Sequence, residues 1–75
     1  MPKTPRIRGR EAVRAFERVG FIHTRTKGSH FILKKDGHPH VLSVPVHQGK
    51  TIKPPLLDAL IDAAGLTMDE FIELL

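Results

Sequence analysis

The middle of the chain contains three short segments with strand-forming composition, and segments with helical spacing stand on both sides of it. Residues 21–26, 30–35 and 40–44 are rich in β-branched, aromatic and aliphatic side chains and are separated by glycine or proline. Three strands of this length cannot bury a core by themselves, so helices must pack against one face of their sheet. The sequence therefore predicts an α+β domain with a three-stranded antiparallel meander and helices on one face.

Glycine and proline residues mark the ends of these expected strands. Lys27-Gly28-Ser29 forms a turn between the first two strands, and Asp36-Gly37 is typical of a two-residue hairpin between the second and the third. Pro39 and Pro45 flank the third segment. Because proline is tolerated on edge strands and not on central ones, we expect the third strand at an edge of the sheet.

The first helix is expected over residues 10–20. Its apolar side chains recur at helical intervals, and Gly20 follows at a position where helices commonly end. The preceding residues 1–7 contain two prolines and are expected to form a loose basic arm. The apolar positions of this helix are Ala12, Val13, Phe16 and Val19.

Two further helices are expected after residue 53. Pro54-Pro55 suit the first turn of a helix, where the missing N–H groups would have no partner in any case, and Gly65 ends that helix. Thr67 and Glu70 have the spacing of a capping box that begins a helix over residues 68–75. The order is α-β-β-β-α-α without repeats or linkers, so residues 1–75 are expected to form a single domain.

Composition narrows the class of protein. The chain has 75 residues and no cysteine, so neither a disulfide nor a thiolate metal site can stabilise it. No apolar run approaches the roughly 18 residues that a membrane-spanning helix needs, and the basic start lacks the apolar stretch of a secretory signal. We therefore expect a cytoplasmic protein with no association with a membrane.

Charge is divided unevenly along the chain. Residues 1–53 hold all 12 Lys and Arg residues against three acidic ones, for a net charge of +9, whereas residues 54–75 hold five acidic residues and no Lys or Arg, for −5. A basic front with an acidic tail favours a nucleic-acid-binding face. The helix-turn-helix spacing of residues 56–75 does not indicate a DNA reader, because its second helix would offer only acidic groups to the phosphates.

His30 is the candidate catalytic residue. Strand alternation pairs Phe31 with Leu33 on the side expected under the helices, which places His30 outward together with Lys34. Gly28, two residues earlier, would let a ligand approach the backbone closely. An exposed strand histidine is more often an ordinary surface residue, so its neighbours must decide its role.

The stretch "HQGKTIKPP" is a second candidate site. Lys50 and Lys53 precede a helix whose first turn has unpaired N–H groups and positive dipole character, which is a typical phosphate site. Prolines 54 and 55 remove two of those donors, so the lysines would carry more of the binding. The alternative is that these lysines only solvate a loop.

The other histidines raise the alternative of a metal site. His38, His40 and His47 could together supply three imidazole ligands to zinc. Pro39 separates the first two, and no Asp or Glu is an obvious partner to orient them. His38 is then expected to be a polar residue of a hairpin tip, and we expect no metal.

The motifs taken in order resemble the HicA toxins, small mRNA-cleaving endoribonucleases of toxin–antitoxin pairs. The resemblance covers about residues 8–71 and is carried by "GF", "KGSH", "DG", "VPVH", "GK", "IKP" and "AGLT". It implies a fold similar to a double-stranded-RNA-binding domain, an essential histidine at His30, a HicB-type antitoxin as partner and no catalytic metal. The chain departs from the family at "KPPLL", where the family often has Lys-Pro-Gly-Thr-Leu, which weakens the expected phosphate contact there.

Together these patterns predict a metal-independent endoribonuclease that cleaves mRNA without a cofactor. RNA carries its own nucleophile, the 2′-OH, so the protein needs to supply only proton transfer and charge stabilisation. His30 would act as general acid or base, and His47 is a candidate second proton carrier. The expected RNA-binding residues are Lys27, Gly28, Ser29, Lys34, Lys50 and Lys53. The alternatives are a non-catalytic RNA-binding module that uses the same basic face and a small metal-binding protein.

Overall fold

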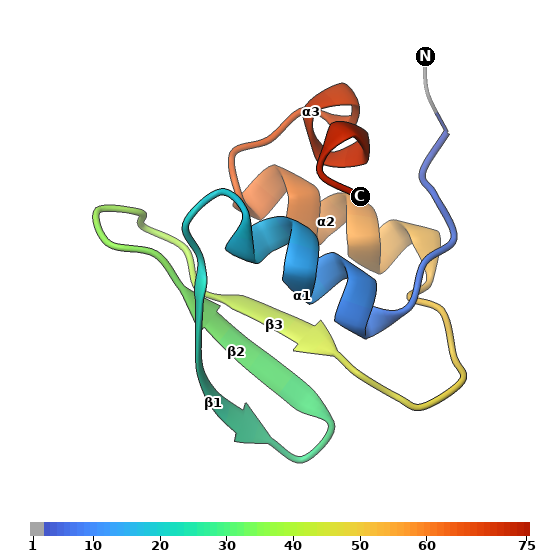
Figure 1. Ribbon diagram of the computed structural model, residues 1–75, viewed down its shortest axis with the longest axis horizontal. Coiled ribbons are helices and arrows are strands. Elements are labelled where there is room, and N and C mark those ends of the chain that lie inside the picture. The colour runs from blue at the N-terminus through green and yellow to red at the C-terminus, as the bar shows by residue number, and fades with distance from the viewer. Residues whose placement is uncertain (1–2) are drawn as a thin grey trace.

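The computed structural model describes residues 3–75, whose elements follow in the order helix, three strands and two helices (Figure 1). The predicted α-β-β-β-α-α order and the α+β class are confirmed. Met1 and Pro2, the first residues of the expected basic arm, lie outside the described residues. The elements are α1 (Gly9–Glu17), β1 (Ile22–Lys27), β2 (His30–Lys34), β3 (Leu42–Pro45), α2 (Pro54–Ala63) and α3 (Met68–Glu73).

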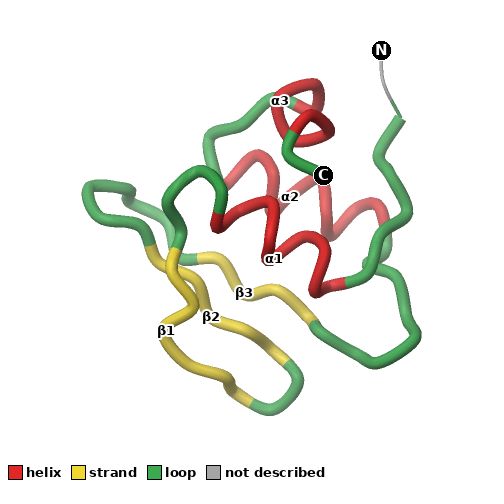
Figure 2. The backbone as a smooth tube through the Cα atoms, viewed as in Figure 1, coloured by secondary structure: helices red, strands yellow, loops and turns green. Residues whose placement is uncertain are grey.

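The strands form one antiparallel sheet in which β2 is central and β1 and β3 are the edges. All three helices lie to one side of this sheet (Figure 2). His30 pairs with Lys27 of β1 on one side and with Pro45 of β3 on the other. Pro45 therefore lies on an edge strand, as predicted, where a residue without an N–H is tolerated.

Side chains of the sheet alternate between a covered face and a bare one. On β2, Leu33 is buried and Phe31 half-buried under the helices, whereas His30 and Lys34 are exposed on the opposite face. β3 alternates in the same way and exposes Ser43. The outward orientation predicted for His30 is confirmed.

Three phenylalanine rings from distant parts of the chain form the centre of the core. The Phe16 ring of α1 lies 6.0 Å from that of Phe21, just before β1, and 5.2 Å from that of Phe71 in α3. Burying each such side chain contributes about 1.5–3 kcal/mol. The other large side chains that are fully buried are Leu33, Leu42, Val44 and Leu57.

Glycine ends both of the longer helices at the predicted positions. After α1, the N–H of Phe21 donates to the Phe16 carbonyl at 3.2 Å, and the N–H of Gly20 donates to the Glu17 carbonyl at 3.1 Å. This pair of bonds is a Schellman motif, and the apolar contact between Phe21 and Phe16 accompanies it. α2 ends in the same way at Gly65.

The predicted capping box begins α3. The Thr67 hydroxyl accepts a hydrogen bond from the N–H of Glu70 at 3.1 Å, and the Glu70 carboxylate accepts one from the N–H of Thr67 at 2.9 Å. Hydrogen bonds from the Thr67 backbone and then from its side chain lower the pKa of the Glu70 carboxyl below its ordinary value. The start of α3 is therefore fixed by its own sequence.

The connection between β2 and β3 corrects one prediction. Asp36 and Gly37 do lie at the centre of a turn, in which the N–H of His38 donates to the Lys35 carbonyl at 3.0 Å. However, the strands end at Lys34 and resume only at Leu42, so the two-residue hairpin is wrong. The chain leaves the sheet here because His38 packs toward the helices.

His38 is consequently not a polar residue of a hairpin tip. Its Nε2 donates to the carbonyl of Ala63 at the end of α2, at 2.7 Å. Its ring also packs edge-on against Phe21, with 5.2 Å between the ring centroids. These two contacts fasten the 35–41 loop to the core.

The part of the N-terminal arm that precedes α1 packs against the core. Ile7 is buried, with 7% of its surface exposed, and its carbonyl accepts a hydrogen bond from the N–H of Ile52 at 2.8 Å. Farther out, the Thr4 hydroxyl donates to the Asp58 carboxylate. The expectation of a loose arm is therefore wrong for Ile7, because this apolar side chain completes the core.

Helix α1 begins in close contact with the end of β3. A Cβ at Gly9 would lie 2.1 Å from the Pro45 carbonyl oxygen and 2.9 Å from the Cα of Val46. Both are backbone atoms, so no side-chain rotation could relieve the overlap, and only glycine fits. This contact brings the first turn of α1 beside the segment that follows β3.

No helix within residues 3–75 combines the length and the apolar character needed to cross a membrane.

Candidate active site

His30 occupies the first position of β2 on the bare face of the sheet. Its Nδ1 lies 3.1 Å from the Ser43 hydroxyl oxygen of β3, within hydrogen-bonding distance. The side chain is exposed, so the bond to Ser43 orients the ring while Nε2, on its opposite side, stays accessible to a ligand. A fixed imidazole with one accessible nitrogen is suited to proton transfer.

His47, in the segment after β3, lies beside His30. The centroids of the two rings lie 6.5 Å apart, and the ring planes are nearly perpendicular at 83°. Both side chains are exposed. Two imidazoles at this spacing can approach one phosphodiester from different sides.

The turn before β2 supplies the adjacent cation. Lys27, the last residue of β1, pairs directly with His30. Gly28 has φ of 60°, which a glycine adopts without strain, and a Cβ there would meet no atom within 4 Å. The Ser29 carbonyl accepts a hydrogen bond from the N–H of Val46 at 2.7 Å, which ties the turn to the segment that carries His47.

The other predicted RNA-binding lysines are exposed and lie in different places. Lys34 ends β2, four residues from His30, which is about 13 Å at roughly 3.3 Å per residue. Lys50 closes the turn that His47 begins, its N–H donating to the His47 carbonyl at 3.1 Å. Lys53 precedes the first residue of α2. The structure therefore brings Lys27 and Lys50 near the two histidines through local geometry, and leaves Lys34 at the far end of its strand.

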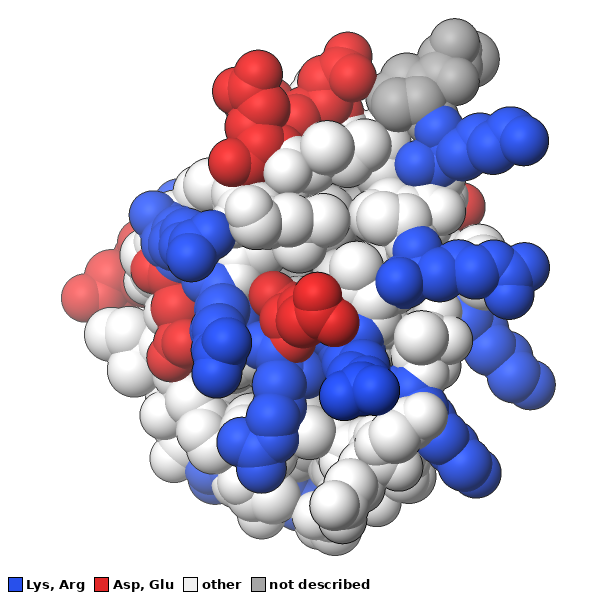
Figure 3. Space-filling view, turned by 45° about the vertical axis from the view of Figure 1, so that its right-hand side comes forward, with Lys and Arg blue, Asp and Glu red and all other residues white. Residues whose placement is uncertain are grey.

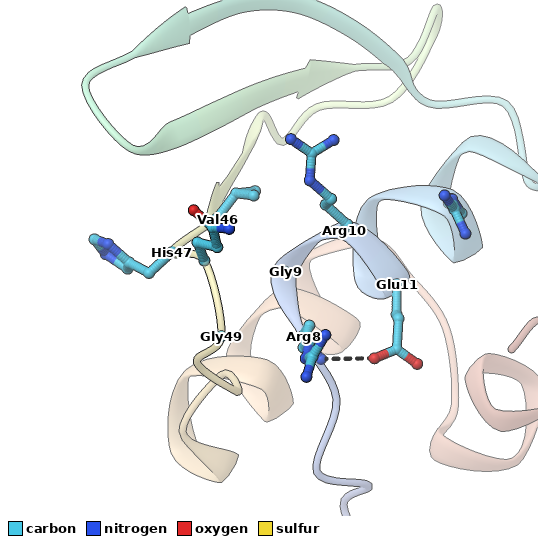
Figure 4. Close-up of a pocket in the computed structure, with 9 residues that line it drawn as sticks. Arg8, Gly9, Arg10, Glu11, Val46, His47 and Gly49 are labelled. Carbon is cyan, nitrogen blue, oxygen red and sulfur yellow. Dashed lines mark hydrogen bonds between the residues drawn. The ribbon is translucent and has the colours of Figure 1, made fainter.

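A cleft of about 670 Å³ lies between α1 and the segment after β3. Arg10 extends from α1 toward the sheet, and His47 stands on the opposite wall with its ring directed away from α1 (Figure 4). The carboxylate of Glu11 accepts a hydrogen bond from the N–H of Arg8 at 3.1 Å, which holds the first turn of the helix. The residues that line the cleft are Arg8, Gly9, Arg10, Glu11, Arg14, Val46, His47, Gln48 and Gly49.

The charge division of the sequence is partly a division in space. Basic side chains extend along the right-hand side and across the lower front of Figure 3, whereas acidic ones lie at its top, at its left edge and in one group among the basic ones at the centre. The acidic residues of α3 are Asp69, Glu70 and Glu73. Because the cleft is lined by three arginines, this side of the molecule attracts an anionic ligand.

The histidines proposed as an alternative metal site are separated. The His38 and His40 rings are neighbours, with 5.9 Å between their centroids, but His38 Nε2 is bonded to the Ala63 carbonyl. His47 instead lies beside His30. Among residues 3–75 no three His, Cys, Asp or Glu side chains are grouped so that they could hold a metal ion.

Ser43, Arg10 and Arg14 belong to this site and were not among the predicted site residues. Ser43 shares the outward face of its strand, but its position opposite His30 depends on a register that the longer 35–41 loop sets. Arg10 and Arg14 are four residues apart on one helix, a signal that was present in the sequence. Their position beside His47 follows from the contact of Gly9 with Pro45, which no local pattern reveals.

The family to which the chain belongs can now be given. Residues 9–66, from the start of α1 to the turn after α2, match the family described as "HicA toxin of bacterial toxin-antitoxin". The proteins of this family are toxins of toxin–antitoxin systems. The chain belongs to the HicA toxin family, and the resemblance of its motifs to that family is confirmed. No curated protein matches the chain closely in sequence.

Proposed function

We propose that this toxin is a metal-independent endoribonuclease that cleaves mRNA, with His30 as its principal catalytic residue. The observation that carries the proposal is the convergence of His30 and His47, 6.5 Å apart, beside an arginine-lined cleft. Membership of the HicA toxin family supports it. The substrate supplies the nucleophile, so two proton carriers and a cationic surface suffice for the reaction.

The proposed reaction is attack of the 2′-oxygen on the adjacent phosphorus, followed by release of the 5′-oxygen. One imidazole accepts the proton of the 2′-OH as its oxygen forms a bond to phosphorus, and the other donates a proton to the 5′-oxygen as the P–O5′ bond breaks. The products are a 2′,3′-cyclic phosphate and a 5′-hydroxyl. General acid–base catalysis of this kind contributes about 10²–10⁴-fold.

Lys27 and the cleft arginines are assigned to the phosphates. Negative charge increases on the non-bridging oxygens while the transition state forms, and nearby cations stabilise it most when they are already in position. Lys27 is suited to this because it pairs with His30 across the sheet. Lys50 and Lys53 bind flanking phosphates in this proposal, and Ser43 positions the His30 ring.

The proposed partner is a HicB-type antitoxin that covers His30. A basic active site attracts an acidic protein rapidly through electrostatic steering. Direct occlusion of the bare sheet face would silence the enzyme without any rearrangement of the toxin.

The test is to incubate the purified protein with a single-stranded RNA, with and without EDTA, and to identify the ends produced. We expect cleavage in both conditions, with 2′,3′-cyclic phosphate and 5′-hydroxyl ends. Binding without cleavage would instead indicate an RNA-binding module. Loss of cleavage in EDTA with recovery on addition of zinc would contradict the metal-independent mechanism.

A further inference from the structure

A second, smaller cleft lies on the helix-covered side of the sheet, opposite His30. It measures about 160 Å³ and runs between the exposed side of α1 and the β1–β2 hairpin. Arg10 and Arg14 line both this cleft and the larger one that contains His47, so the two clefts adjoin along α1. We call this pair of clefts the groove. The other residues that line the smaller cleft are Val13, Glu17, His23 and Phe31.

Its floor is a fixed pair of aromatic rings. The His23 imidazole stacks on the Phe31 ring with 4.2 Å between centroids and 2° between planes. Its Nε2 lies 2.9 Å from the Thr26 hydroxyl oxygen, so the ring is held at its edge as well as on one face. Both rings are half-buried, so each leaves part of its surface exposed in the cleft.

An imidazole is not what packing alone would favour here. His23 pairs with Leu33, on the face where the sheet otherwise buries apolar side chains. A larger apolar residue would extend the core, whereas His23 leaves a flat, partly exposed surface in a cleft that Arg10 and Arg14 also line. Flat aromatic surfaces flanked by cations are what single-stranded nucleic acids bind, since bases stack on the ring while phosphates contact the cations.

We propose that this groove binds an unpaired nucleotide next to the cleavage site. Its base would stack at His23 and its phosphates would contact Arg10 and Arg14. The RNA would then pass His47 around the end of the sheet to reach His30. The inference rests on the proposed function for the identity of the ligand as RNA, and it adds a requirement that the flanking nucleotide be unpaired.

The decisive comparison is between two apolar substitutions of His23. His23→Phe keeps a flat aromatic face on Phe31, whereas His23→Leu keeps the apolar contact and removes that face. Both are made in a His30→Ala background, so that bound RNA stays intact, and folding is checked by circular dichroism. The probe is fluorescein-labelled oligo(A) of about 12 nucleotides, a length typical of such sites, compared with a duplex of equal length.

We expect His23→Leu to weaken single-strand binding about tenfold or more relative to His23→Phe, since one stacked base is worth about 1–3 kcal/mol. Duplex binding should not differ between the two, because a paired base cannot enter the groove. His40→Leu, an exposed histidine on the 35–41 loop, is the matched control and should have no effect. Equal single-strand affinities for the two His23 variants would overturn the proposal.

The outcome is separable from that of the proposed function. Cleavage by the parent that requires His30, together with equal affinities of the two His23 variants, would refute the groove alone. A difference between those variants in a parent that does not cleave RNA would refute the nuclease alone. If the substitutions changed binding only to the proposed HicB-type antitoxin, the groove would be a protein-docking surface and the proposal would be wrong.

Discussion

Two pairs of histidines stand at opposite ends of the sheet, and their surroundings differ more than their spacing. The His30–His47 rings are 6.5 Å apart and the His38–His40 rings 5.9 Å, each pair roughly perpendicular. In the first pair both side chains are exposed and His47 lines the basic cleft, whereas the Nε2–H of His38 donates a hydrogen bond to the Ala63 carbonyl. Proximity alone therefore does not identify a reactive pair, and the bonds already made by the ring nitrogens are more informative.

The largest expected effect is that of His30→Ala on RNA cleavage. We expect the rate to fall about 10²–10⁴-fold, because the principal proton carrier is lost. Stability should change by no more than about 0.5 kcal/mol, since the side chain is exposed and only its bond to Ser43 is removed. Single-turnover cleavage and thermal unfolding measure the two quantities. A variant that cleaves at a rate near that of the parent would remove His30 from the mechanism.

His47→Ala should have the next largest effect. As the second proton carrier it should contribute about 10²-fold, at the low end of the range for acid–base groups. The pH–rate profile gives a sharper test, because loss of one of two proton carriers should convert a bell-shaped dependence into a one-sided one. A bell-shaped profile that survives the substitution would show that His47 only lines the cleft.

His38→Ala should give the reverse pattern. Cleavage should be unchanged, while the free energy of unfolding should fall by about 1–2 kcal/mol, because a part-buried carbonyl loses its donor and Phe21 loses a packing partner. For a domain of this size, each 1 kcal/mol lowers the melting temperature by about 4–8 °C. The matched control is His40→Ala, which should alter neither quantity. Impaired cleavage by a stable His38→Ala variant would contradict the division into reactive and structural pairs.

The smallest predicted effect compares two sets of cations around the His30–His47 pair. Each phosphate contact on a single strand contributes about 0.7 to the slope of log affinity against log salt. Replacing Arg10 and Arg14 together, or Lys50 and Lys53 together, should therefore flatten that slope by about 1–1.5. Both double variants remove the same charge, so a slope altered by only one of them would identify which wall of the site follows the RNA backbone.

Much of the fold could be predicted because its signals are local. Gly20, Gly65 and the Thr67–Glu70 capping box each fix a helix end through residues a few positions away. The outward orientation of His30 followed from alternation along a single strand. The prediction of a two-residue hairpin between β2 and β3 was wrong although Asp36-Gly37 does form a turn. The packing of His38 against Phe21 and Ala63, which are distant in sequence, determines where the strands end.

Only part of the candidate site could be predicted, because the rest depends on contacts between segments that are distant in sequence. His30 and its turn are contiguous in sequence and were predicted, and His47 was predicted as a second proton carrier in the stretch after the third strand. Ser43 and the two cleft arginines reach the site through strand register and through the approach of α1 to β3. The first contact spans 13 residues and the second joins Gly9 to Pro45, and no spacing rule in one sequence encodes either of them.

Because a Cβ does not fit at Gly9, a single substitution there should weaken this toxin. Alanine at that position would push the first turn of α1, and Arg10 with it, away from Pro45, while the side chains of His30 and His47 would stay unchanged. The strain would increase the cost of folding, so such a chain would be folded in the cold and would lose its structure on modest warming. Gly9→Ala would thus give a temperature-sensitive toxin. A host cell that carries it could be grown at the higher temperature and then exposed to the active protein by cooling.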